Sequence, residues 1–198
     1  VTIGLLGIAA PLSFALASSL SYRPARFMGV EKTLLLTVLM IITGHLLRAF
    51  AWDATALFFG SLLSLLGMGI GNVLLPVMVR KYFPNRVGVV SSFYLTLTAI
   101  SATMASFVAV PVSDLAGWRF SLGQWAILAL FTIAPLSFLL KNSKPEAKAE
   151  RAEGHKAIWR SPTAIAIAGM QAVTAIIGYV SFAWLPLMLV EHQRVSVI

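Results

Sequence analysis

The stretch ATALFFGSLLSLLGMGIGNVLLPVMV, residues 54–79, decides the fold, because its 26 residues include no acidic, basic or histidine side chain. A helix needs about 20 apolar residues to cross the hydrocarbon of a bilayer. The run ends at Arg80 and Lys81, and after the basic segment 80–86 a second uncharged run covers 87–113. These two runs predict two membrane-spanning helices that are joined by a short basic loop.

The composition of the whole chain extends this pattern. Of the 198 residues, 59% are hydrophobic and 11% are charged, whereas a soluble domain carries about 25% charged residues. A cytosolic enzyme, a disordered tail and a nucleic-acid-binding domain are therefore excluded. We predict an all-α polytopic membrane protein with six transmembrane helices, which lie within residues 1–22, 33–51, 54–79, 87–113, 120–140 and 161–190.

The net charge of +8 indicates the orientation in the membrane. Twelve of the 15 basic residues fall in three loops, and the other three are Arg48, Arg119 and Arg194. Cytoplasmic loops collect Lys and Arg, so we expect a multi-pass protein of the plasma (inner) membrane and no nucleic-acid partner. Both chain ends then lie outside and the chain starts with Val, so we expect a fragment of a longer multi-span protein. The loops expected on the cytoplasmic side are 21–32, 80–86 and 141–160.

One long polar segment divides the chain. Residues 141–161 are rich in Lys, Glu and Ala, and we expect a cytoplasmic linker with a short helix at 145–158. Residues 1–140 would form five spans of an N-terminal helix bundle, and residues 162–198 would hold the first span of a C-terminal bundle. Many transporters are built from such paired bundles, with the substrate site between them near the midplane of the membrane.

Two ionisable side chains lie inside the stretch 33–51. His45 and Arg48 are three residues apart, so they share one face of the predicted helix. Charged groups within spans are costly and are functional candidates by default. Arg48 could bind an anionic or polar substrate through charge-assisted hydrogen bonds. The alternative is that its side chain extends to the outer membrane interface.

The stretch 54–79 carries small and polar residues in its second half. Gly67 and Gly71 have the small-xxx-small spacing that lets helices approach closely, so helix packing is the favoured interpretation. Asn72 needs a partner, because an unpaired side-chain amide in the membrane is costly. Contact with a ligand and a hydrogen bond between helices are equally good interpretations of Asn72.

A stripe of small and polar residues follows the next predicted helix. Ser92, Thr96, Ala99, Thr103 and Ser106 recur every three or four residues, which places them on one face. The stripe could line a water-filled pathway. It could also be a helix–helix seam in which the hydroxyls bond to carbonyls of their own helix, and the seam is slightly favoured.

The inventory of reactive groups disfavours catalysis. No carboxylate lies inside any of the six stretches, and Asp53, Asp114 and Glu191 lie at their ends. The chain also has no Cys. Paired-carboxylate chemistry, a metal site and a catalytic triad all lack parts, so we expect no enzyme, no cofactor and no metal.

Two neighbouring segments, GIGNVLLP at 69–76 and RKYFPNRV at 80–87, resemble the major facilitator superfamily, and in particular its cyanate and nitroimidazole permease branch. The resemblance implies a partial major-facilitator fold, in which the six stretches are helices two to seven of twelve. Further agreement with the branch lies in GVEK at 29–32, Gly44 with Arg48, and WRSP at 159–162 with WLP at 184–186.

Together with the residue patterns, this resemblance implies a secondary active transporter that works by alternating access. Its substrate would be a small anion or a small polar organic solute such as a cyanate- or nitroimidazole-like compound. A proton is the candidate coupling ion, and the lipid bilayer and the missing helices of the parent transporter are the expected partners. The alternative is a truncated or non-transporting membrane module, such as a regulatory or assembly partner.

The same reasoning names two sets of candidate site residues. The substrate pathway is expected at Arg48, Asn72, Tyr179, Thr96 and Thr103. Positions of helix packing or gating are expected at Gly67, Gly69, Gly71, Gly29 and Pro76.

Overall fold

The computed structural model describes residues 2–142 and 161–193, and every regular element in these ranges is a helix. The all-α fold predicted from the composition is therefore confirmed. The linker predicted at 141–161, with its short helix at 145–158, lies almost wholly outside the described residues. The elements are α1 (Thr2–Met28), α2 (Val30–Ala49), α3 (Ala54–Tyr82), the 3-10 helix η1 (Pro84–Arg86), α4 (Val87–Ala116), α5 (Trp118–Phe131), α6 (Ile133–Asn142) and α8 (Pro162–Gln193).

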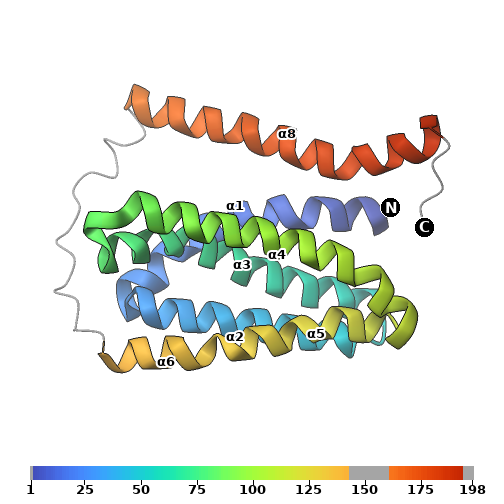
Figure 1. Ribbon diagram of the computed structural model, residues 1–198, viewed down its shortest axis with the longest axis horizontal. Helices are drawn as coiled ribbons and strands as arrows, with labels where there is room; N and C mark the ends of the chain where they lie inside the picture. The colour runs from blue at the N-terminus through green and yellow to red at the C-terminus, as the bar shows by residue number, and fades with distance from the viewer. Residues whose placement is uncertain (1, 143–160, 194–198) are drawn as a thin grey trace. The chain divides into compact units, whose positions relative to one another are not determined.

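The chain divides into two compact units, Val1–Glu146 and Ala147–Ile198. In the first unit, helices α1 to α4 run alternately in opposite directions, and α5 and α6 follow one another in a single direction (Figure 1). The second unit contains α8, one long helix of 32 residues. The first unit holds all of the candidate site residues except Tyr179.

Several helices have the length and composition of membrane spans. Four segments of the first unit qualify, and helix α1 covers the first stretch that the sequence predicts as a span. Helix α8 contains a shorter apolar segment, Pro162–Gly178. These helices are those of an integral membrane protein. The four qualifying segments are Val30–Ala49, Ala54–Tyr82, Pro84–Ala116 and Trp118–Lys141.

The connections are shorter than the loops predicted at 21–32 and 80–86, so those bounds are wrong. Gly29 alone separates α1 from α2, and Phe83 alone separates α3 from η1. The helices extend beyond the uncharged stretches because Arg and Lys are good helix formers. A positive charge is also favoured in the last turn of a helix, where Arg26 of α1 lies.

The span predicted at 120–140 is built from two helices that meet at Thr132. The backbone N–H of Thr132 donates to the carbonyl of Ala129 at 3.1 Å, and its hydroxyl donates to the same oxygen at 2.7 Å. Pro135 has no N–H to donate to the carbonyl of Phe131, four residues earlier, and its ring disfavours a regular helix there. The proline therefore explains the interruption.

Helices α2 and α3 form the most extensive contact in the first unit, and glycines let their backbones approach. A Cβ atom on Gly44 of α2 would lie 2.6 Å from the backbone nitrogen of Ser64. A Cβ on Gly60 would lie 3.1 Å from a backbone nitrogen of α2, and one on Gly67 would lie 2.9 Å from a backbone carbonyl oxygen of α2. Small residues at such contacts allow the close packing that holds helices together in lipid, which is itself as apolar as a leucine side chain.

Helix α2 also contacts α5 and, less extensively, α1 and α6. Gly123 of α5 has no room for a side chain, because its Cβ would lie 2.8 Å from that of Ala49. Arg119, at the start of α5, donates a hydrogen bond to the carbonyl of Ala51, just beyond α2, at 3.0 Å. Helix α1 packs against α3 at Gly69, whose Cβ would lie 2.6 Å from a β-carbon of α1. Helix α2 thus lies at the centre of the first unit.

We predict that Gly44→Ala lowers the free energy of unfolding by about 1–3 kcal/mol, the usual cost of overpacking. The added methyl group must displace the backbone of α3, because the new Cβ would lie only 2.6 Å from the backbone nitrogen of Ser64. The matched control is Gly88→Ala, at which a Cβ meets nothing within 4 Å and alanine favours the helix. Denaturation in detergent micelles, followed by circular dichroism, measures both variants. Equal stability of the two variants would contradict the close approach of α2 to α3.

Candidate functional site

Arg48 lies in the last turn of α2, against α3. Its side chain is half-buried, and its Cγ atom is 3.0 Å from the position that a Cβ on Gly60 would take. The Nε atom is buried and finds no hydrogen-bond partner among the described residues. A buried N–H group without an acceptor is costly. This guanidinium therefore offers an unsatisfied donor at the contact between α2 and α3.

His45 lies one turn before Arg48 and is 4% exposed. Its Nδ1 atom is 3.2 Å from the carbonyl oxygen of Leu122 in α5. Because a carbonyl oxygen only accepts, Nδ1 carries the hydrogen in this contact. The two ionisable residues thus differ in role, since His45 ties α2 to α5 whereas Arg48 keeps a donor available.

Asn72 lies on an exposed face of α3. The core residues Ile70 and Leu74 are two positions before and after it, and two residues of a helix turn through about 200°. Asn72 therefore points away from the core. Arg48 contacts α3 at Gly60, which is about 18 Å from Asn72 along the helix axis. The structure does not bring Asn72 and Arg48 together.

Thr96 and Thr103 lie on α4, which has no buried residue in the described part of the chain. Thr96 donates its hydroxyl to the carbonyl of Ser92 at 2.9 Å, and Thr103 donates to that of Ala99 at 3.0 Å. The small and polar stripe is thus exposed, with these hydroxyls bonded to their own helix. Thr103 also borders an open, mainly apolar groove along α4, which is lined by Ala99, Ile100, Met104, Phe107 and Val108.

The other predicted positions occupy different environments. Gly67 packs against α2, whereas Gly69 packs against α1. A Cβ on Gly71 would make ordinary contact, 3.8 Å from a hydroxyl oxygen of α2. Pro76 is an exposed residue inside α3. Tyr179 belongs to α8 of the second unit, and its side chain lies outside the described part of the chain.

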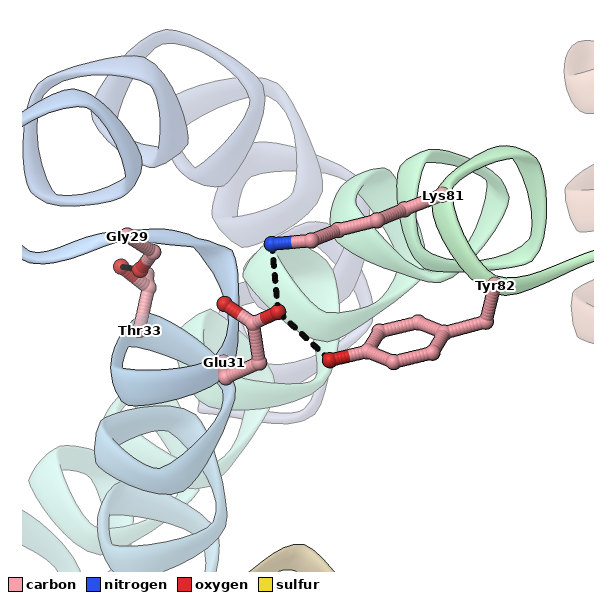
Figure 2. Close-up of polar contacts among 5 residues, drawn as sticks. All are labelled: Gly29, Glu31, Thr33, Lys81 and Tyr82. Atoms are coloured by element: carbon pink, nitrogen blue, oxygen red, sulfur yellow. Dashed lines mark hydrogen bonds and ion pairs between the residues drawn. The ribbon is translucent and has the colours of Figure 1, made fainter. Parts of the chain in front are cut away.

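A polar cluster forms where α2 begins and α3 ends (Figure 2). Glu31, in the first turn of α2, is 4% exposed. Its Oε1 atom accepts a hydrogen bond from the Tyr82 hydroxyl at 2.8 Å and lies 2.6 Å from Nζ of Lys81. A buried carboxylate is costly unless it is paired and hydrogen-bonded, and Glu31 finds both partners on α3. The cluster therefore fixes the start of α2 to the end of α3.

The predicted stretch 33–51 does not include Glu31, although α2 and its candidate span begin at Val30. The expectation that no carboxylate lies inside a span is therefore wrong at this helix end. The sequence signal for the helix start is Gly29, whose φ of 86° favours glycine, followed by an acidic residue in the first turn. Thr33 closes the turn by donating its hydroxyl to the carbonyl of Gly29 at 2.8 Å.

Comparison with known proteins agrees with this apolar, helical structure. The family model of the Major Facilitator Superfamily matches residues 1–198. The "Uncharacterized transporter YycB" of Bacillus subtilis is 32% identical over 183 residues, which cover 91% of the chain and 45% of that protein. The 2-nitroimidazole transporter of Escherichia coli is 30% identical over 194 residues, which cover 96% of the chain and 48% of that protein.

A more distant similarity joins the chain to a plant protein. Sugar transport protein 2 of Arabidopsis thaliana is 26% identical over 144 residues, which cover 71% of the chain and 28% of that protein. The chain spans about half the length of the two bacterial relatives. Because the family model matches all of residues 1–198, the chain belongs to the major facilitator superfamily.

Proposed function

We propose that the chain supplies part of a secondary active transporter that carries a small anion or a small polar organic solute, such as a cyanate- or nitroimidazole-like compound, by alternating access. Membership of the major facilitator superfamily supports transport across a membrane. The relative named as a 2-nitroimidazole transporter supports the class of solute. The observation that carries the proposal is the unsatisfied donor of Arg48.

Arg48 suits an anionic or polar solute for an electrostatic reason. Its Nε–H is already removed from solvent and has no acceptor among the described residues, so a solute that accepts from it adds a hydrogen bond without a new desolvation cost for this donor. Hydrogen bonds from a guanidinium to an anion are short and strong. The neighbouring His45 is engaged with Leu122 through Nδ1, which leaves Arg48 as the cation for the solute.

The remaining candidates would line the pathway at other depths. Asn72 is exposed on α3, about 18 Å from Gly60 along the helix axis. Thr96 and Thr103 are exposed on α4, and Thr103 borders the groove there. Each residue offers a polar group to a passing solute. Tyr179 would contribute from the second bundle.

The proposal includes an organisation into two bundles. Residues 1–140 would form part of the N-terminal bundle, 141–161 would be the linker, and 162–198 would start the C-terminal bundle. The division of the chain after Glu146 is in keeping with this organisation. The basic connections would face the cytoplasm from a plasma membrane, as the positive-inside rule predicts, and a proton is the candidate coupling ion.

We predict that Arg48→Ala lowers uptake of labelled cyanate or 2-nitroimidazole by at least about tenfold, because one hydrogen bond to a charged group contributes about 1.5–3 kcal/mol. Arg48→Lys should retain part of the uptake, since it keeps the charge and loses the Nε donor. Uptake is measured, at equal protein levels, in cells that express the transporter containing this chain.

The matched control for Arg48 is Lys141→Ala, which removes an exposed cation at the end of α6 and should leave uptake unchanged. If Arg48→Ala takes up either solute as fast as the unaltered protein, Arg48 does not bind it. If the unaltered protein takes up neither solute, the proposed solute class is wrong.

We predict that Asn72→Ala lowers the same uptake by about three- to tenfold, the loss expected for one neutral hydrogen bond. The melting temperature should stay unchanged, because the amide is exposed on α3. The control is Gln124→Ala, which removes an amide that donates to the carbonyl of Ser121 in its own helix. A lower melting temperature with unchanged uptake would instead assign Asn72 to a hydrogen bond between helices.

A further inference from the structure

The end of the first unit at which α2 begins carries a concentrated positive charge. We propose that this end binds the headgroup of an anionic phospholipid such as phosphatidylglycerol. The inference goes beyond transport, because it concerns the membrane around the protein and not the solute. We term five of the exposed cations at this end the basic rim: Arg23, Arg26, Lys32, Arg80 and Arg86.

The fold brings the basic rim together. Gly29 alone separates α1 from α2, so the cations of both helices flank one tight turn. The contact of Glu31 with Lys81 and Tyr82 places the end of α3 beside the start of α2. Arg86 follows directly in η1. Figure 1 shows this end at the left of the first unit, where α1 turns into α2 and α3 passes into η1.

No exposed carboxylate offsets these cations among the described residues at this end. Glu31 is the acidic residue there, and it is buried and paired with Lys81. Asp53 caps the start of α3 and Asp114 lies near the end of α4, so both belong to the opposite end. The exposed charge at the basic rim therefore has one sign, and such a surface attracts anions.

The surroundings favour a lipid over a soluble anion. Phe27, near the end of α1, is 84% exposed, and Phe83, directly after α3, is 50% exposed. Long basic side chains can lie along apolar surface while their charge reaches the headgroup level. The spans Val30–Ala49 and Ala54–Tyr82 begin and end here, which places the cations at headgroup depth. The cytoplasmic leaflet, which the basic connections are proposed to face, carries anionic lipids.

The test compares phosphatidylglycerol with phosphatidylcholine of identical acyl chains, bound to the purified chain in detergent and measured by native mass spectrometry. Each basic residue near an anionic surface raises affinity by about fivefold, so phosphatidylglycerol should bind at least about 25-fold more tightly than phosphatidylcholine, the contribution of two such residues. The preference should fall as salt rises, because salt screens exposed charges. Equal binding of the two lipids would overturn the proposal. Displacement of phosphatidylglycerol by an equal concentration of glycerol phosphate would also overturn it, in favour of a site for soluble anions.

Charge-removing variants locate the site. The double variant Arg80→Gln and Arg86→Gln should weaken phosphatidylglycerol binding by about 25-fold, or fivefold for each cation, and leave phosphatidylcholine binding unchanged. Both side chains are exposed, so the fold should persist. The matched control is Arg119→Gln, at the opposite end of the first unit, which should keep the preference. A loss of about fivefold in this single-charge control, the same as for each cation of the basic rim, would show that net charge alone attracts the lipid, and the proposal would fail.

Glu31→Gln tests the basic rim in the opposite direction. The substitution removes the carboxylate that neutralises Lys81, so the positive charge of this end rises by one. Binding of phosphatidylglycerol should strengthen by about fivefold. A folded Glu31→Gln protein whose binding is unchanged or weaker would contradict the proposal. If circular dichroism shows that this variant has lost its helices, the double variant Arg80→Gln and Arg86→Gln tests the proposal in its place.

Discussion

The close approach of the α2 and α3 backbones is the constraint on which the rest of the first unit depends. Helices in lipid gain little from burying apolar side chains, so tight contact between backbones has to supply the packing. Glycines on both helices make that contact possible, and α2 then presents another side to α5. The buried hydroxyls of Thr37 and Ser64 bond to carbonyls of their own helices. This keeps the contact between the two helices narrow and both of these hydroxyls satisfied.

A charged side chain lies at each end of the contact between α2 and α3, and the two differ in their hydrogen-bond partners. Glu31 is buried with two partners, one of them Tyr82, 51 positions away in the sequence, and a partner at that distance becomes visible only in the fold. Arg48 keeps a buried Nε without a partner among the described residues. Its candidacy follows from the sequence, since a charge inside an apolar stretch can be read there. Its distance from Asn72 depends on where α2 crosses α3, which no spacing in the sequence encodes.

The helices themselves follow from the sequence because the thickness of the bilayer sets a minimum length for an uncharged run. Their ends are harder to predict, since Arg26 is as compatible with the last turn of a helix as with a loop. Glycine spacing has a similar limit. Gly67 and Gly69 are two residues apart, yet they pack against α2 and α1 respectively. Spacing predicts that helices approach each other, whereas the identity of each neighbour depends on how the helices are arranged in space.

The turn at Gly29 has a mechanical consequence. Gly29 alone separates α1 from α2, and its carbonyl oxygen accepts a hydrogen bond from the hydroxyl of Thr33. The connection between the two helices is therefore short and held in place. A displacement of α1 along its axis must therefore pass directly into α2. Because α2 lies against α3 with no room at Gly44 for even a methyl group, we expect α1, α2 and α3 to move together as one rigid group.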